Sequence, residues 1–328
     1  MQKLNKAKKY IPVILLVIII GFPLVPFIHT IELYNPISGI YFEVHGTYSV
    51  AVDYTKPVVK IPERFFFRPV TQTCRKPISE TKGCEVVEEI EIPDTVTKID
   101  VGSFSAYDKL KRVTGGKEVR VICEGAFRSD DILTEVPYFE NVEVIEQDAF
   151  IDCGIKYLKL PNTIKEIGDE AFAYNEIEEL DADLNNVTLG IHVFLKNPFE
   201  KEMGDFAIFP DGSLQEYNGH DETIVIPAGV TAISGAFYDF DDDSENIKIY
   251  VPSSVTKISD DSFWFSNHGI VYIPDSVIEI GYYNDEEQYS FYDASIVTTK
   301  GSYAEEFAKK YNIDYEIVDE IEYPDTTE

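Results

Sequence analysis

The sequence has little positive charge and few of the residues that build metal or redox centres. Its 28 lysines and arginines stand against 59 aspartates and glutamates, which gives a formal net charge of −31 over 328 residues. A surface this acidic repels phosphate backbones, so we expect no nucleic-acid partner. The four cysteines include no C-x-x-C pair, and the five histidines include no H-x-x-x-H pair. We therefore expect neither a bound metal nor a cofactor.

The motifs of common enzymes are missing as well. There is no G-x-S-x-G elbow, and the Gly-Gly-Lys at 115–117 is followed by Glu118 instead of the serine or threonine of a phosphate-binding loop. In a chain with 59 acidic residues, two neighbouring carboxylates are weak evidence for a glycosidase. We expect a protein without catalytic activity, and an exported hydrolase is the least favoured alternative.

An acidic run in the second half of the chain resembles the start of a calcium loop. Asp239, Asp241 and Asp243 occupy alternate positions, as calcium ligands do. Ser244, however, stands where such a loop needs a bending glycine, and Tyr250 stands where it needs a bidentate glutamate. We interpret the run as a solvated acidic loop, with weak calcium binding as the alternative.

An apolar run near the N-terminus predicts a membrane anchor. Residues 1–10 carry four lysines, and residues 11–28 are an apolar run that would be about 27 Å long as a helix, just enough to cross a bilayer core. The lysines predict that residues 1–10 lie in the cytoplasm and that the chain from about His29 lies outside, as a single-pass protein of the cell membrane. Secretion after signal cleavage is the alternative, because Pro23 and Pro26 interrupt the run.

An internal repeat determines the predicted fold. The segments IEIPDTVTKIDVGSF, LKLPNTIKEIGDEAF and IYVPSSVTKISDDSF align on Pro93, Pro161 and Pro252. Each has apolar residues one and three places before the proline and three and six places after it, and a phenylalanine eleven places after it. Along the first half of the chain the phenylalanines recur every 22 or 23 residues, at positions 104, 127, 150, 172 and 194.

This spacing predicts a solenoid of stacked coils. The apolar alternation before each proline is typical of a strand with one buried face, and the proline ends that strand. The next two apolar residues are expected to turn the chain, and the phenylalanine to fill the interior. Because one coil cannot bury its own faces, stability comes from stacking, which predicts seven to nine coils with a parallel sheet along one side.

The repeat resembles the BspA-type leucine-rich repeat family of bacterial surface proteins, whose motif I-P-x-x-V-x-x-I-G-x-x-A-F is matched best by LPNTIKEIGDEAF. The resemblance covers about residues 57–318. It implies a β-dominated leucine-rich repeat solenoid with a first array at 57–200 and a second at 205–318, opened by a hairpin at 206–219. Ser302 and Glu305 predict a capping box before a short closing helix. Residues 29–56 are then a membrane-proximal segment, and 319–328 a disordered tail.

The four cysteines fall into two groups. Cys74 and Cys84 bracket a polar loop and could close a small disulfide outside the cell, whereas Cys123 and Cys153 lie within repeats as buried thiols.

The residues two places before the prolines are expected to point outward. In the first array these are charged, as at Lys60, Glu91, Glu135 and Lys159, but in the second they are Val225, Tyr250 and Tyr272.

The outward positions of the second array, Val225, Tyr250 and Tyr272, form a candidate binding strip together with Lys248 and Ile270 alongside. Tyr250 and Tyr272 are expected on adjacent strands about 5 Å apart, where they would expose an aromatic surface to a peptide or a glycan. Ordinary cross-strand packing is the alternative. The resemblance implies adhesion to an extracellular protein, so we expect a membrane-tethered binding surface for an extracellular protein or glycan. A structural or regulatory ectodomain that binds a partner of its own envelope is the alternative.

Overall fold

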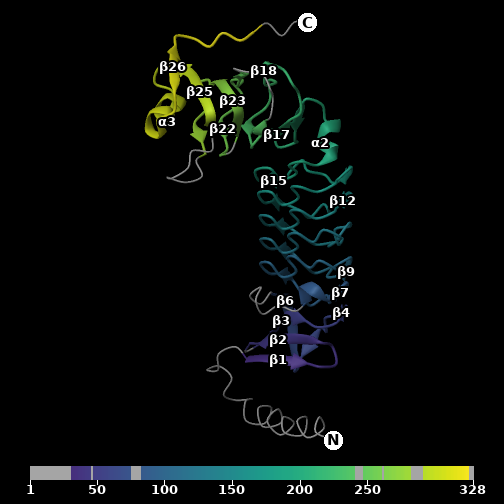
Figure 1. The fold of residues 1–328 in the computed structure, drawn as a ribbon. Helices are drawn as coiled ribbons and strands as arrows, with labels where there is room; N and C mark the ends of the chain where they lie inside the picture. Colours follow the sequence, from purple (N-terminus) through teal and green to yellow (C-terminus); the bar gives the residue numbers. More distant parts are fainter. Residues whose placement is uncertain are drawn as a thin grey trace, which may run out of the picture.

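The computed structural model describes residues 31–45, 47–74, 83–240, 247–260, 262–281 and 291–324. This part of the chain is a β-solenoid of about ten stacked turns, mostly short strands with few helices. Figure 1 shows the first array as a column and the second array turning away from its axis beyond helix α2 (Pro198–Glu202). None of the helices in the described ranges is long and apolar enough to cross a bilayer, and the predicted anchor at 11–28 lies outside them.

Most coils of the first array contribute two strands, not one. The strand before the proline, or at the same place in coils that lack a proline, forms one set of parallel pairs: β4 (Val58–Lys60), β7 (Glu89–Ile92) and β9 (Arg112–Gly115), then β12 (Tyr157–Lys159) and β14 (Glu179–Asp181). The step after the proline, which we expected to turn the chain, forms the longer ladder: β6 (Arg68–Thr73), β8 (Lys98–Ile99), β10 (Val121–Ile122), β11 (Val144–Ile145), β13 (Glu166–Ile167) and β15 (Thr188–Leu189).

The expectation of one sheet was therefore wrong. Coils of equal length bring the same two residues into register, so that Ile122 lies between Ile99 and Ile145. The backbone groups at this step then find partners in the neighbouring coils, which buried amides require. The short hairpin of β5 (Arg64–Phe65) with β6 precedes this regular part.

The predicted phenylalanine column is confirmed. The five rings at 104, 127, 150, 172 and 194 are fully buried, and successive centroids lie 5.2, 4.9, 5.3 and 5.8 Å apart in stacked geometry. The backbone N–H of Phe127 donates to Ala149 O of the next coil (2.8 Å), and that of Phe150 donates to Ala171 O (2.8 Å). A single residue per coil therefore both fills the interior and hydrogen-bonds to the next coil.

The second array begins with the predicted hairpin, in which β16 (Phe206–Ile208) pairs antiparallel with β17 (Ser213–Tyr217). Its two parallel ladders continue from there. One contains β17, β19 (Ala232–Ile233), β22 (Lys257–Ile258) and β24 (Glu279–Ile280). The other contains β18 (Thr223–Val225), β21 (Ile247–Tyr250), β23 (Phe263–Tyr272), β25 (Phe291–Thr299) and β26 (Tyr315–Val318), with β20 (Phe237–Phe240) beside β23. Its core is separate from that of the first array.

Both ends of the described solenoid are covered. Strands β1 (Ile31–Asn35), β2 (Ile40–Val44) and β3 (Ser49–Tyr54) form an antiparallel meander whose last strand pairs with β6. The first core thus begins at Ile40, inside the segment that we assigned to a membrane-proximal region. At the other end, Ser302 Oγ accepts the backbone N–H of Glu305 (3.0 Å) and caps α3 (Tyr303–Tyr311), as predicted.

Candidate functional site

Cross-strand ion pairs line the surface of the first array, and two of them, Lys60–Glu91 and Lys159–Asp181, lie at the outward positions. Arg112 contacts Glu89 at 2.5 Å, and Arg120 contacts Glu143 at 2.6 Å. Lys165 also contacts Glu143, and the two cations, Lys165 first, hold the pKa of that carboxyl below its usual range. Further pairs link neighbouring coils: Lys60–Glu91, Lys111–Glu88, Lys117–Asp94, Lys156–Glu176 and Lys159–Asp181. Each exposed pair contributes little stability, but together they leave this face polar and internally matched.

The second array carries a different surface at the equivalent positions. The strand register places Val225 beside Tyr250 and Tyr250 beside Tyr272. The two tyrosine rings are stacked, with centroids 4.1 Å apart and planes 7° from parallel. In the next row, exposed Lys248 pairs in register with half-buried Ile270. The structure thus brings together the five residues of the candidate strip, and their role in binding stays a prediction.

The strip is less exposed than we expected, because another part of the chain lies on it. Tyr250 is only 8% exposed, and the ring of Tyr323 lies 5.9 Å from it. The Tyr323 hydroxyl donates to the carbonyl oxygen of Val251 (2.7 Å). Burial, followed by the neighbouring Tyr272 hydroxyl, raises the pKa of Tyr250 to about 12.

We call residues 319–324 the C-terminal strap. We predicted these residues to be part of a disordered tail, but they lie within the described ranges. They run back from β26 over the second array, as the yellow trace in Figure 1 shows. An apolar-x-Tyr-Pro sequence, Ile321 to Pro324, within an acidic stretch is the feature that could have indicated this contact. Residues 325–328 lie outside the described ranges.

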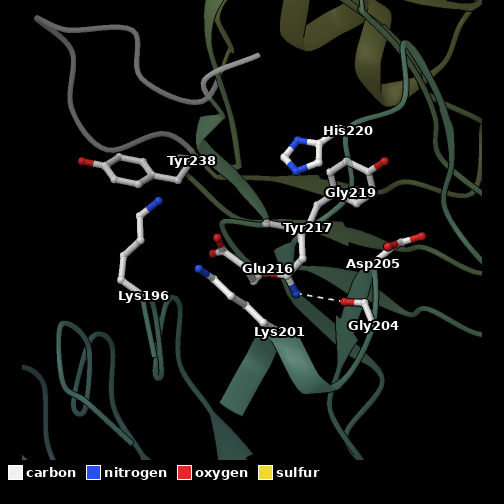
Figure 2. Close-up of a pocket in the computed structure, with 11 residues that line it drawn as sticks. Lys196, Lys201, Gly204, Asp205, Glu216, Tyr217, Gly219, His220 and Tyr238 are labelled. Carbon is white, nitrogen blue, oxygen red and sulfur yellow. Dashed lines mark hydrogen bonds between the residues drawn. The ribbon is translucent and has the colours of Figure 1, made fainter. Parts of the chain in front are cut away.

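A second candidate site lies at the joint between the two arrays. A cavity of about 450 Å³ opens there, and Figure 2 shows Lys196 and Lys201 reaching into it from the first array and the joint, with Tyr238 and His220 on the opposite side. Glu216 also lines the cavity. The remaining lining residues are Gly204, Asp205, Tyr217, Asn218, Gly219 and Ala236. Among the described residues the lining has no serine, threonine or cysteine nucleophile, and it holds two lysines and two acidic residues, so neither sign of charge prevails.

The joint beside this cavity is held by buried polar groups that the sequence did not single out. His192 Nε2 donates to Gly235 O across the arrays (3.0 Å), and burial lowers the pKa of this histidine. Gln215 donates to Gly190 O (2.9 Å) and accepts from the backbone N–H of Val193 (3.3 Å). These bonds fix the first coil of the second array against the last coil of the first array.

Glu200 of α2 is buried at the same joint, with 1% of its surface exposed. Among the described residues, neither of its carboxyl oxygens has a hydrogen-bond partner. Burial, followed by repulsion from Glu216, raises the pKa of Glu200 to about 9. The carboxyl is therefore neutral at physiological pH, which is how a buried acid without a counter-ion avoids the cost of charge.

The other sequence-based candidates stay predictions. Cys74 and Cys84 are half-buried at either side of residues 75–82, which lie outside the described ranges, and the disulfide between them is untested. Cys123 and Cys153 are buried, and burial raises the pKa of Cys123 to about 12. Of the acidic run, 241–243 lie outside the described ranges. Within those ranges, no three histidine, cysteine or acidic side chains gather as a metal site would require.

The comparisons with known proteins agree with this architecture. The model of the BspA type leucine rich repeat region matches residues 81–194 and 216–310 in six copies, which is more than half of the chain. No curated protein matches the chain. A leucine rich cell surface protein from Faecalibacterium prausnitzii is 21% identical, with a TM-score of 0.49 over 78% of this chain and 73% of that one. A leucine-rich repeat protein from Bacteroides ovatus is 19% identical, with a TM-score of 0.45 over 84% and 65%. The repeat, its stacked phenylalanines and the family match together identify the chain as a member of the BspA-type leucine-rich repeat family.

Proposed function

We propose that this chain is a non-catalytic surface protein that binds an extracellular protein or glycan through the strip of its second array. One observation carries the proposal. At the outward positions of the first array, Lys60 pairs with Glu91 and Lys159 pairs with Asp181, whereas the equivalent row of the second array holds a stacked tyrosine pair. Stacked aromatic rings offer a large, rigid contact area at low entropic cost, which is why they are enriched where binding energy concentrates.

The surroundings of the tyrosine pair support the same proposal. Exposed Lys248 adds a flexible cation beside the rings, and Val225 and Ile270 extend the apolar surface at both strands. The described lining of the joint cavity holds no serine, threonine or cysteine and the sequence carries no common catalytic motif, so we infer that this chain acts by contact, not by chemistry. The lysines of residues 1–10 and the apolar run of 11–28 support display on the outer face of the cell membrane through an N-terminal anchor.

The test is binding of residues 31–328, which include both cores, to an array of matrix proteins, mucins and glycans, with and without calcium. The double variant Tyr250→Ala, Tyr272→Ala should lose binding of any captured ligand at least tenfold. Because Tyr250 is buried, Lys248→Glu serves as a second variant that alters the strip without opening a cavity. The matched control is Tyr138→Ala, Tyr174→Ala, which removes two exposed tyrosines of the first array.

The outcomes separate three cases. Loss in both strip variants, with binding and melting curves unchanged in the control, supports the proposal. Equal binding by all variants refutes the strip as the contact surface. Capture of nothing by the wild-type chain, in either calcium condition, refutes an extracellular ligand of these classes and favours a partner within the cell's own envelope, which crosslinking on intact cells would identify.

A further inference from the structure

The C-terminal strap takes an unusual path across the second array. It leaves β26 at Val318, and Tyr323 then contacts Tyr250 on β21, although β25 and β23 lie between those two strands. Three strand spacings amount to about 14 Å, and five extended residues span at most about 17 Å. The strap therefore crosses from β26 to β21 within a few residues, after bends at Asp319 and Glu320.

The strap is held at few points. Asp319, Glu320 and Glu322 are exposed, and Tyr323 itself is 42% exposed. Its hydroxyl end is the covered part, because it donates to Val251 O and because burial raises the pKa of Tyr323. A segment with this exposure can detach without opening the core, since local opening costs little where few apolar contacts are lost.

We infer that the strap is an internal occupant of a peptide-docking site, and that the natural partner presents an extended apolar-x-Tyr-Pro segment that displaces it. This inference rests on the proposed function and names its ligand class. The strap shows the fit, because its tyrosine lies against the Tyr250 ring and its hydroxyl reaches a strand-end carbonyl. An extended peptide laid across a rigid sheet face loses less entropy than one that must also order the receptor.

The partner segment is expected to differ from the strap in charge. The strap carries three of the carboxylates that make up the net charge of −31, so long-range repulsion opposes its own docking. A partner segment with neutral or basic residues in place of Glu320 and Glu322 escapes this repulsion. The chain is therefore suited to a neutral or basic tyrosine-containing segment, and the acidic strap is a weak competitor that such a segment can replace.

The test measures binding of a synthetic peptide in trans. The probes are fluorescein-labelled IVDEIEYP, which is residues 317–324, and the same peptide with lysine at both glutamates. They are titrated by fluorescence anisotropy against residues 31–328 as wild type, as Tyr323→Ala and as Tyr303→Ala. Tyr303 is a matched control, since it is a similarly exposed tyrosine, on α3. An intramolecular occupant lowers the apparent affinity of a competitor, so its release should raise that affinity.

We expect saturable binding to Tyr323→Ala that is at least tenfold tighter than binding to wild type or to Tyr303→Ala. The lysine peptide should bind tighter than the native one at low salt, and the difference should shrink as salt rises. Adding Tyr272→Ala to Tyr323→Ala should abolish binding of both peptides.

Three results would overturn the inference. Binding of the peptide to wild type as tightly as to Tyr323→Ala would show that the strap does not occupy the site. No binding to a Tyr323→Ala chain with an unchanged melting curve would show that the site takes no such peptide. A wild-type dimer that the peptide dissociates would show that the strap is seated on a second copy. If the panel of matrix proteins, mucins and glycans yields strip-dependent binding while the peptide does not bind, the proposed function survives without this inference.

Discussion

Replacement of Glu200 by glutamine should make the protein more stable at neutral pH, although it alters a buried residue. The carboxyl lies at the joint with 1% of its surface exposed, next to the like charge of Glu216. Its pKa rises from 4.5 to about 9 on folding. In the folded chain it therefore keeps its proton at pH 7, whereas the unfolded chain releases it above about pH 4.5.

The size of the effect follows from proton linkage. Below the unfolded pKa both states are protonated and the group costs nothing. As the pH rises from 4.5 towards 9, only the unfolded state gains from ionisation, so the free energy of unfolding falls by about 1.4 kcal/mol per pH unit. At pH 7 the loss amounts to roughly 3 kcal/mol. Glutamine has nearly the same shape and cannot ionise, so Glu200→Gln should recover this amount at pH 7 and almost none of it at pH 4.5.

The measurement is urea unfolding followed by circular dichroism at several pH values, with the fluorescence of Trp264 as a local probe of the second array. Glu202→Gln is the matched control, because Glu202 lies two residues away on the same helix and is exposed. The difference between Glu200→Gln and wild type should grow from pH 5 to pH 8, while the control stays within about 0.5 kcal/mol of wild type. A Glu200→Gln chain that is less stable at pH 7 would refute the reasoning, because it would mean that the native carboxyl is ionised and paired.

Two further substitutions test the stacking and the capping of the coils. Ile167→Asp should bury an unpaired charge between coils and lower the free energy of unfolding of the first array by several kcal/mol, roughly 3–5, whereas Glu166→Gln beside it should change little. Equal urea midpoints for the two variants would contradict the register of β13. Ser302→Ala should cost about 1 kcal/mol by removing the cap of α3, and exchange of the α3 amides with deuterium should rise first in that variant. Unchanged protection at α3 would mean that the cap contributes nothing.

The column of phenylalanines could be predicted because each coil devotes one position to one kind of residue. Five phenylalanines at steps of 22 or 23 fix the length of the coil, and equal coils must place these rings above one another. The opening hairpin and the capping box of α3 were equally accessible, since turn and cap chemistry is local. The family resemblance rests on this same local information.

The second ladder of strands could not be predicted in the same way. Lys98–Ile99 and Val121–Ile122 are two residues long, so neither contains an alternation that a sequence pattern could reveal. They are strands only because the coils above and below supply their hydrogen-bond partners. Which side of a coil forms the longer ladder is thus decided by stacking and not by propensity.

Contacts between distant segments explain the other differences. Glu200 belongs to a short charged stretch, and it is buried because the second array packs against α2 and the last coil of the first array. Tyr323 follows the last strand without any periodic pattern, and its hydroxyl end is covered only because it reaches Tyr250 and Val251, which lie more than 70 residues earlier. Single-residue contacts at such separations leave no trace in local composition.

A solenoid separates the residues that hold it together from those that face outward, and this separation explains how one repeat can carry two surfaces. The inward positions are constrained in both arrays, because every coil must fill the same interior. The outward positions are not, so in the first array they can offset repulsion within a chain of net charge −31, as Arg120 and Lys165 do on either side of Glu143. The row of Tyr250 and Tyr272 contains no such pair among the described residues. Charge balance therefore does not account for this row, and this is why we place the proposed binding site there.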